Sequence, residues 1–169
     1  SWSTEEGLPQ SSVHRILQTR DGYIWVATEG GIARFDGVTF EVYRRQGEPA
    51  LTSDDVCCLA EDQAGALWIG TRDGVVRLQD GKFRRFSEAD GVPSLPVISI
   101  ASLQDGSLFV LTTSGLVQGD HGHFQKLPLT LPRITGMEKA SGGGVWLIGE
   151  GEVLRLQHGK LQPWPAGKQ

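Results

Sequence analysis

The chain has 169 residues, including 23 glycines and five tryptophans, and a formal net charge of −4 at pH 7. The acidic balance excludes nucleic acid as the expected partner, because a phosphate backbone is bound by a basic face. No apolar run is long enough to span a bilayer, so we expect no direct membrane insertion of this segment.

One pattern recurs four times along the chain. In each copy a glycine stands three positions before a large residue, and a bulky apolar residue follows fifteen positions after it. The central residues are Trp25, Trp68, Phe109 and Trp146, and the later ones are Phe40, Phe83, Phe124 and Leu161. Steps of 43, 41 and 37 residues predict an all-β fold, a β-propeller of four-stranded antiparallel blades with four repeats in this chain. We place the repeats at about 11–45, 54–88, 95–128 and 132–165, in a single propeller segment that covers residues 1–169.

The first residues resemble the end of a strand from an incomplete repeat. Trp2 lies eleven residues before Val13, as Phe86 lies eleven residues before Val97, and both aromatic residues precede a Gly-x-Pro sequence. We interpret residues 1–10 as an outer strand remnant, which either closes the last blade of a ring or marks a longer array. Because the chain lacks an initiator methionine and a signal peptide, we interpret it as a mature or excised segment.

Each repeat is expected to form four short strands joined by tight turns. The first strand is apolar and β-branched, which predicts burial on both faces. The second strand carries the central aromatic, which we expect to pack between neighbouring sheets. The third strand follows a glycine turn, and the fourth is an outer edge with charges that face solvent. The second strands include 23–28 and 66–71, the third strands 32–35, 75–78, 116–117 and 153–156, and the fourth strands 40–43, 83–86, 124–127 and 161–164.

Two stretches closely resemble the two-component regulator propeller repeat. Residues 2–37 contain Trp-Ser-Thr-Glu-Glu-Gly-Leu-Pro and then Asp-Gly-Tyr-Ile-Trp-Val-Ala-Thr-Glu-Gly-Gly-Ile, and residues 62–78 contain Gly-Ala-Leu-Trp-Ile-Gly-Thr-Arg-Asp-Gly-Val. The third and fourth copies fit less closely. Phe109 replaces the tryptophan, Gly149 replaces the threonine, and the fourth turn is expected to be one residue shorter, with its glycine at Gly151.

The resemblance implies a non-catalytic sensor of a bacterial membrane receptor, located in the periplasm or outside the cell. A membrane span and a histidine kinase or diguanylate cyclase normally follow such repeats, and relatives often recognise carbohydrate fragments and signal through dimerisation. Four blades are fewer than the family usually carries. The open ends of such a stack would expose apolar surface, so we expect either a homodimer that completes a larger propeller or removal from a longer parent.

Catalytic motifs are not evident in the sequence. It contains neither a Gly-x-Ser-x-Gly nucleophile elbow nor a phosphate-binding Gly-x-x-x-x-Gly-Lys loop. We interpret His121, His123 and His158 as solvated turn residues and expect no metal site and no cofactor. Carboxylates cluster in loops between the repeats, where turn formation and solubility are their expected roles.

The candidate ligand-binding residues are polar residues of the first strand and of the turns. His14 and Arg15 interrupt the first strand, where the other copies have Cys57 and Cys58, Ile98 and Ser99, or Thr135 and Gly136. Innermost strands line the axis of a propeller, so both side chains could face a polar ligand. The alternative is that they satisfy neighbouring backbone or carboxylate groups. The further candidates are Arg20, Glu29, Arg72 and Asp73.

Two other features favour structural roles. Arg34, Arg77 and Arg155 each follow a tryptophan by nine residues, and we expect them to form hydrogen bonds or ion pairs between blades. Cys57 and Cys58 are predicted to be small buried residues, with a vicinal disulfide as the alternative.

The sequence therefore predicts a ligand-sensing propeller segment that recognises a carbohydrate or another polar ligand. A structural self-assembly module without a small ligand is the first alternative, and a propeller lyase or glycosidase is the second.

Overall fold

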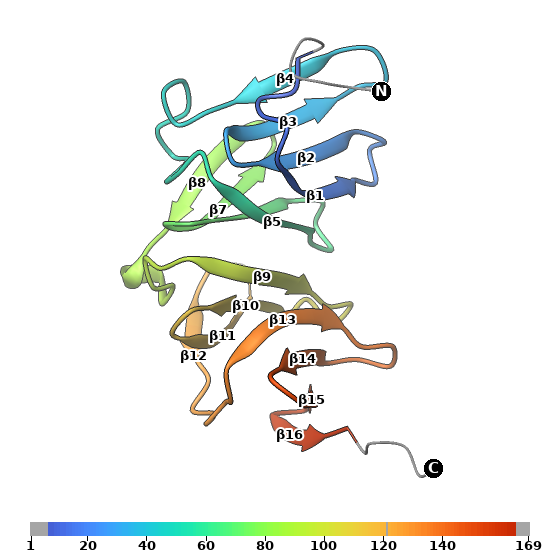
Figure 1. Ribbon diagram of the computed structural model, residues 1–169, viewed down its shortest axis with the longest axis vertical. Helices are drawn as coiled ribbons and strands as arrows, with labels where there is room; N and C mark the ends of the chain where they lie inside the picture. The colour runs from blue at the N-terminus through green and yellow to red at the C-terminus, as the bar shows by residue number, and fades with distance from the viewer. Residues whose placement is uncertain (1–6, 121, 165–169) are drawn as a thin grey trace.

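The computed structural model describes residues 7–120 and 122–164 and contains four sheets of four strands each (Figure 1). Blade 1 contains β1 (Val13–Gln18), β2 (Ile24–Thr28), β3 (Gly31–Phe35) and β4 (Phe40–Tyr43). Blade 2 contains β5 (Val56–Glu61), β6 (Leu67–Thr71), β7 (Gly74–Gln79) and β8 (Lys82–Phe86). Blade 3 contains β9 (Val97–Ser102), β10 (Leu108–Thr112), β11 (Gly115–Gly119) and β12 (Phe124–Lys126). Blade 4 contains β13 (Ile134–Lys139), β14 (Val145–Gly149), β15 (Val153–Gln157) and β16 (Lys160–Pro163).

Each blade is made by one repeat, and its strands are antiparallel neighbours in chain order. The blades follow one another along the molecule, and the first strands of successive blades, β1, β5, β9 and β13, lie side by side (Figure 1). These are the inner strands. The predicted all-β architecture, with four strands in each of four repeats, is confirmed.

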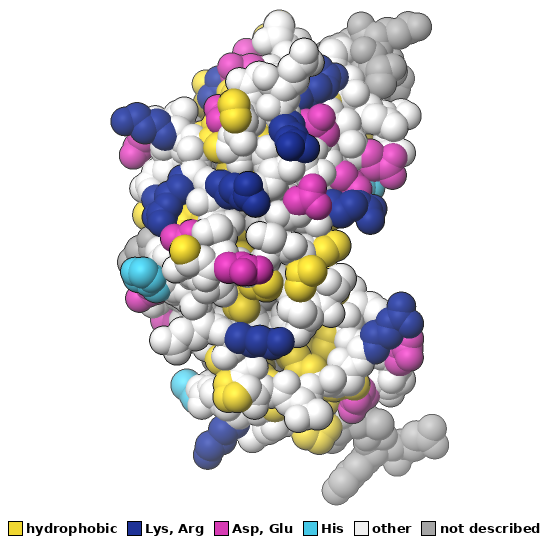
Figure 2. Space-filling model, turned by 90° about the vertical axis from the view of Figure 1, so that its left-hand side faces the viewer, with side chains coloured by type: hydrophobic (Ala, Val, Ile, Leu, Met, Phe, Trp, Pro, Cys, Tyr) yellow, Lys and Arg dark blue, Asp and Glu magenta, His cyan; other side chains and the backbone are white. Residues whose placement is uncertain are grey.

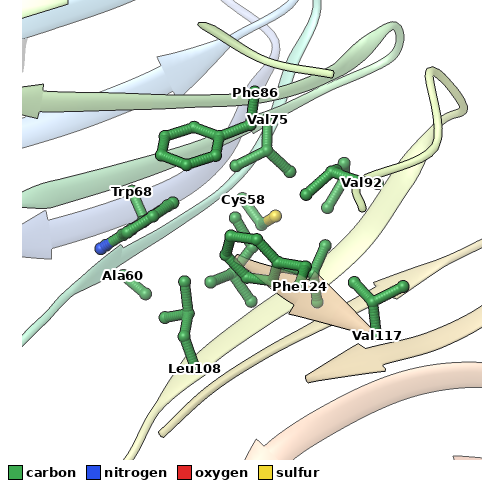
Figure 3. Packing of buried hydrophobic residues seen from close by; sticks show 12 residues of the cluster. Cys58, Ala60, Trp68, Val75, Phe86, Val92, Leu108, Val117 and Phe124 are labelled. Atoms are coloured by element: carbon green, nitrogen blue, oxygen red, sulfur yellow. The ribbon is translucent and has the colours of Figure 1, made fainter. Parts of the chain in front are cut away.

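The hydrophobic core lies at the three junctions between blades. At the junction of blades 2 and 3, Trp68 and Phe86 of one sheet face Phe124 of the next (Figure 3). The ring centroid of Phe124 lies 5.8 Å from that of Trp68 and 5.7 Å from that of Phe86, both in edge-to-face geometry. Such aromatic contacts add to the burial of large apolar areas. The prediction that the central aromatic packs between neighbouring sheets is confirmed at this junction.

A buried threonine at the end of the second strand holds the following turn. The hydroxyl of Thr71 donates to the carbonyl oxygen of Gly74 at 3.0 Å and accepts the backbone N–H of Asp73 at 3.1 Å. Thr28 and Thr112 make the same pair of bonds in blades 1 and 3. The hydroxyl thus satisfies backbone groups that the tight turn cannot pair within the sheet. Gly74 has φ of 126°, a conformation that glycine adopts without a Cβ penalty.

The corresponding turn of blade 4 lacks this threonine but keeps its length. Ile148 pairs with Val153 as Ala27 pairs with Ile32 in blade 1. The expectation of a turn that is one residue shorter is therefore wrong. The glycine with positive φ has moved one position earlier, to Gly151, where φ is 81°.

The inner strand of blade 1 differs from the prediction of burial on both faces. Val13 and Ile16 are 41% and 62% exposed, whereas their equivalents Val56 and Leu59 in blade 2 are 0% and 3% exposed. In blades 2 to 4 these positions pack against the preceding blade, and no described blade precedes blade 1. The apolar pattern of β1 is therefore that of a blade junction whose other half is not among the described residues.

Most of the predicted outer strand remnant, including Trp2, lies outside the described residues. Residues 7–10 contain no strand and run beside blade 1. There the carbonyl oxygen of Pro9 accepts a hydrogen bond from Arg44 Nη2 at 3.4 Å. The interpretation of residues 1–10 as a closing strand stays a prediction.

Replacing Thr71 with valine should destabilise the fold. The substitution keeps the side-chain shape but leaves the part-buried N–H of Asp73 and the buried carbonyl of Gly74 without their partner. We expect the free energy of unfolding to fall by about 1–3 kcal/mol, measured by urea denaturation. Thr71→Ser retains the hydroxyl and should lose clearly less stability. Equal losses in the two variants would show that the hydroxyl does not hold the turn.

Candidate functional site

Two breaks in the apolar pattern of the inner strands meet in space. Arg15 of β1 replaces the buried Cys58 position of blade 2, and Glu138 of β13 replaces the buried Ala60 and Ala101 positions of blades 2 and 3. Arg15 Nη2 lies 3.5 Å from Glu138 Oε2, although the residues are 123 positions apart in the sequence. Both side chains are more than half exposed, so the pair contributes little to stability and its groups are accessible to a ligand.

This ion pair crosses a hollow with a volume of 480 Å³ on the inner strands. All four blades contribute to the lining, which includes Leu17, Arg20, Leu59, Glu61, Gln63, Ile100 and Lys139 besides the ion pair. Arg20 extends along the wall: its Nε lies 3.2 Å from Glu61 Oε2, and its guanidinium donates to the backbone carbonyl oxygens of Asp62 and Gln63. The volume falls in the range of small-molecule sites, and apolar floor residues alternate with charged ones.

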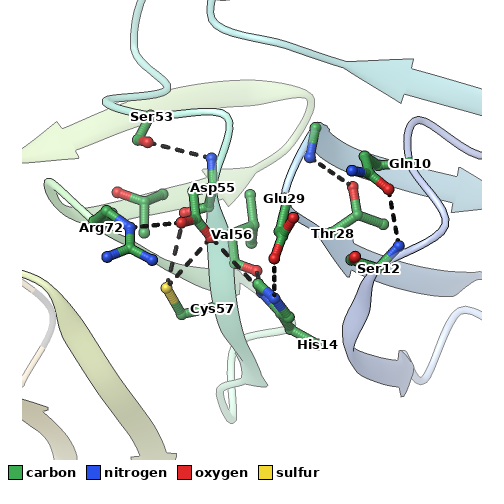
Figure 4. A network of polar contacts seen from close by, with 12 residues as sticks. Gln10, Ser12, His14, Thr28, Glu29, Ser53, Asp55, Val56, Cys57 and Arg72 are labelled. Atoms are coloured by element: carbon green, nitrogen blue, oxygen red, sulfur yellow. Dashed lines mark hydrogen bonds and ion pairs between the residues drawn. The ribbon is translucent and has the colours of Figure 1, made fainter.

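The other sequence-predicted residues gather at the opposite end of the inner strands, at the junction of blades 1 and 2 (Figure 4). His14 Nδ1–H donates to the carbonyl oxygen of Val56 at 3.0 Å, and its Nε2 lies 3.6 Å from Glu29 Oε1. Asp55 joins the group, because its Oδ2 accepts from Arg72 Nε at 2.6 Å and its Oδ1 lies 3.7 Å from His14 Nδ1. This network ties two blades together at their rim.

The six predicted ligand-binding residues therefore divide into separate groups. Arg15 and Arg20 line the hollow, whereas His14, Glu29 and Arg72 surround Asp55 at the far rim. Asp73 lies in the adjacent turn, where its backbone N–H is held by Thr71. His14 and Arg15 both have protein partners, as the structural alternative predicted. A ligand role for any of the six stays a prediction.

Glu138 and Lys139 line the hollow but were not among the candidates from the sequence. Glu138 stands where the other inner strands have Leu17, Ala60 and Ala101. That change from apolar to charged is as clear as the one at Arg15, and it was a signal available in the sequence. Only the fold shows that Glu138 pairs with Arg15, because nothing in the sequence places residues 15 and 138 across one hollow.

Two of the three recurrent arginines, Arg34 and Arg155, make their contacts within their own blades rather than between blades. Arg34 Nη2 lies 2.5 Å from Glu41 Oε2, and its guanidinium carbon is 4.4 Å from the ring centroid of Tyr23. Arg155 donates to the carbonyl oxygens of Ser141 and Gly143 and lies over the ring of Trp146. The expected structural role holds, but these contacts connect strands and turns of a single sheet.

The described residues contain no group of three or more His, Cys, Asp or Glu side chains placed to hold a metal ion. His121, one of the histidines considered from the sequence, lies outside them. Among the loop carboxylates, Asp62 accepts from the backbone N–H groups of Ala64 and Ala66 and from Trp68 Nε1 at 2.8 Å. It therefore has the turn-forming role that the sequence predicted. No helix within the described ranges is long and apolar enough to cross a membrane.

Charges of both signs are scattered over the face shown in Figure 2, and the outline is hollowed between its upper and lower halves. This distribution lacks the basic stripe that a nucleic-acid surface needs.

Cys57 and Cys58 are free thiols in different environments. Burial raises the pKa of the Cys58 thiol to about 12, and it raises the pKa of Cys57 as well, with the nearby Asp55 carboxylate adding to the shift. A thiol that stays protonated at neutral pH is a poor nucleophile. The prediction of a small buried residue holds for Cys58, whereas Cys57 is only partly buried.

Comparison with known proteins identifies the repeats. The sequence model of the two component regulator propeller family matches residues 7–30 and 50–73. The first two of the four repeats are thus similar to two-component regulator propeller repeats. The family resemblance of the first two copies is thereby confirmed. A curated relative, Histidine kinase P4 of Formosa agariphila, is 46% identical over 48 residues, which are 28% of this chain and 4% of that protein.

Solved structures support the propeller fold of these repeats. The extracellular domain of a putative hybrid two component system from B. thetaiotaomicron matches with a TM-score of 0.81 and 22% identity, over 98% of this chain and 26% of that chain. Virginiamycin B lyase from Staphylococcus aureus matches with a TM-score of 0.76 and 16% identity, over 94% of this chain and 57% of that chain. At such identities the likeness concerns the fold alone. The chain spans about a quarter of the first of these proteins.

The thiols give a direct test of the packing between blades 2 and 3. We expect Cys58 to resist alkylation at pH 8 in the folded protein and to react once the chain is unfolded. The free energy of unfolding should also fall as pH rises from about 9 to about 12, because the unfolded thiol ionises near its ordinary pKa of 9.0 while the folded one keeps its proton. Cys58→Ala should reduce this pH dependence of the free energy of unfolding more than Cys57→Ala. Rapid labelling of Cys58 in the native state would contradict the buried position.

Proposed function

We propose that this chain is a non-catalytic, ligand-sensing part of a bacterial two-component-type receptor, located in the periplasm or outside the cell. The support is the combination of two-component regulator propeller repeats with a fold shared by extracellular domains of two-component systems. The observation that carries the ligand-binding part is the hollow on the inner strands, where Arg15 and Glu138 break an otherwise apolar pattern.

The hollow suits a polar ligand such as a carbohydrate. Its lining contains Leu17, Leu59 and Ile100 together with guanidinium, carboxylate and amide groups. Sugars present apolar ring faces together with hydroxyl groups that donate and accept hydrogen bonds. The weak Arg15–Glu138 pair can exchange its mutual contact for contacts with a ligand at little cost in stability.

A sensing role needs binding without turnover. The two carboxylates of the hollow, Glu61 and Glu138, are each paired with an arginine, Arg20 and Arg15. The likeness to virginiamycin B lyase, at 16% identity, carries over the fold and no residue of a reaction centre. Release of product from any glycan that binds would overturn the non-catalytic proposal in favour of a lyase or glycosidase.

A charge exchange separates a ligand role of Arg15 from a structural one. Arg15→Ala should lower the affinity for a glycan identified on an array by about tenfold, because a hydrogen bond to a charged group is lost. The double variant Arg15→Glu/Glu138→Arg restores the ion pair with reversed polarity. It should unfold at the wild-type urea concentration yet bind as weakly as Arg15→Ala, measured by calorimetry.

Arg85→Ala, which removes an exposed arginine from the outer strand β8, is the matched control and should bind normally. Full affinity in the charge-exchanged variant would show that the glycan affinity depends on the ion pair alone and that Arg15 makes no contact with the ligand.

A second function, self-association, is favoured by the exposed face of blade 4. Ile148, Val153 and Trp164 are 45%, 40% and 56% exposed, whereas Ala27 and Ile32, which are the equivalents of Ile148 and Val153, are fully buried in blade 1. The exposed Val13 and Ile16 are the kind of residues that cover this face at the three internal junctions. We infer that a second copy docks its blade 1 on blade 4, and that the reciprocal contact closes a homodimer.

Light scattering after size exclusion over a concentration series tests the homodimer. We expect a species of twice the monomer mass that Ile148→Glu abolishes, because a carboxylate would be buried without a partner. Val38→Glu, at an apolar residue that is 76% exposed on a hairpin, should leave the mass unchanged. A mixture of Ile16→Glu and Ile148→Glu should recover association, since one intact contact remains. A monomer at all concentrations would overturn the proposal.

A further inference from the structure

A cavity of 290 Å³ lies at the edge of the apolar core that joins blades 1 and 2. Three aromatic side chains line it, Trp25 and Tyr43 from blade 1 and Phe83 from blade 2. The ring centroid of Tyr43 lies 5.9 Å from that of Trp25 and 5.2 Å from that of Phe83. The residues that line this cavity and those that line the hollow on the inner strands do not overlap, so the proposed sensing function does not use the cavity.

The same three repeat positions are closely packed at the junction of blades 2 and 3 (Figure 3). Trp68, Phe86 and Phe124 occupy them there and are 1%, 1% and 5% exposed. At the junction of blades 1 and 2, by contrast, Tyr43 and Phe83 are only partly buried. Space beside an aromatic ring forfeits dispersion contacts, and an apolar group that enters it regains them. The cavity therefore offers an apolar ligand the packing that the next junction makes with its own side chains.

The charges of the lining favour a cation. The carboxylates of Asp21 and Asp80 both line the cavity. The hydrogen bonds that Asp21 accepts within the described chain go to Oδ1, so Oδ2 keeps its lone pairs for a ligand. The exposed Asp80 side chain forms no hydrogen bond or ion pair with another residue that the structure describes. The guanidinium of Arg34, which also lines the cavity, is already paired with Glu41 Oε2 at 2.5 Å.

The aromatic walls add to this preference, because the face of an aromatic ring carries partial negative charge and attracts cations. Burial raises the pKa of Tyr43 to about 12, so its ring is neutral at pH 7 and acts through that face. The volume of 290 Å³ lies at the lower end of the range of small-molecule sites and leaves room for about one ring with a short substituent.

We propose that this cavity binds a small organic cation, an ammonium group carried on an apolar body of about one ring. The apolar body packs among Trp25, Tyr43 and Phe83, and the ammonium group pairs with Asp21 and Asp80 at the turns. Such a ligand contacts both blades and stabilises their junction, because it binds only where the two sheets are packed together. The site is additional to the hollow on the inner strands and takes a different class of ligand.

Three probes that differ only in their end group test the preference for a cation. Calorimetry at pH 7 compares phenethylammonium, 2-phenylethanol and 3-phenylpropionate, which share a phenyl ring on a two-carbon chain. The cation should bind on the order of tenfold more tightly than the alcohol, since it gains the carboxylates and the ring faces, and the anion should bind least. Equal affinity for all three, tighter binding of the anion, or no binding of the cation would each overturn the proposal.

Asp80→Asn removes the charge while it keeps the shape of the side chain. Asp80 has φ of 51°, a conformation that asparagine also adopts, so the turn should be retained. The affinity for phenethylammonium should fall about threefold, and that for 2-phenylethanol should not change. Glu152→Gln, which removes an exposed carboxylate from a turn of blade 4, is the matched control and should bind both probes normally. Equal losses in the two variants would show that only the net charge acts and would contradict the site.

Phe83→Trp locates the bound probe. The larger ring occupies part of the cavity, so both the cation and the alcohol should bind several-fold more weakly, while urea denaturation should show a protein that still folds. Unchanged affinity for phenethylammonium in this folded variant would place the probe elsewhere and overturn the proposal. The glycan affinity is measured on the same variant and should not change, because Phe83 does not line the hollow.

Discussion

Every blade of this protein is a sheet with two apolar faces, and its stability depends on the cover that its neighbours provide. In blade 2 one face, with Leu59, packs on blade 1, and the other, with Trp68, packs on blade 3. Apolar residues at these positions recur in each repeat, and in blades 2 and 3 they pack against a neighbouring blade on both sides. Only the inner edges, the turns and the outer edges of the blades need not be apolar for packing against a neighbouring blade.

The candidate site lies where the demand for packing is weakest. The equivalents of Arg15 and Glu138 in blade 2 are buried at a junction, but in the terminal blades both side chains are more than half exposed, so neither charge is buried between sheets. The turn position of Gln63 is likewise outside the junctions. Residues at such positions can vary with the ligand while the scaffold of junctions stays the same, which is how one repeat fold accommodates different binding partners.

The sequence predicted the architecture because the constraint on the junctions repeats every forty residues or so. The spacing from Trp68 to Phe83 covers parts of three strands and the two turns between them, and a chance sequence would not keep that register in four copies. The site was predicted only in part. Arg15 was visible as a break in the pattern, but its partner Glu138 was found only from the fold. The link between His14 and Asp55 depends on the packing of blade 2 beside blade 1, which composition and period do not specify.

The two ends of the stack and the hollow are physically connected. Arg15 belongs to blade 1 and Glu138 to blade 4, and β5 and β9 lie between their strands. A ligand that binds both side chains would link the terminal blades across the axis, whereas each junction resists change because it is a close-packed apolar core. We therefore expect such a ligand to act through small changes in the angle at the three junctions and not through changes within a blade. The three changes add up at the outward faces of blades 1 and 4, which are the faces that any further blade would contact. Binding at the axis and association at the ends would thus both change the angles between blades. A sensor requires such a coupling between its ligand and its partner.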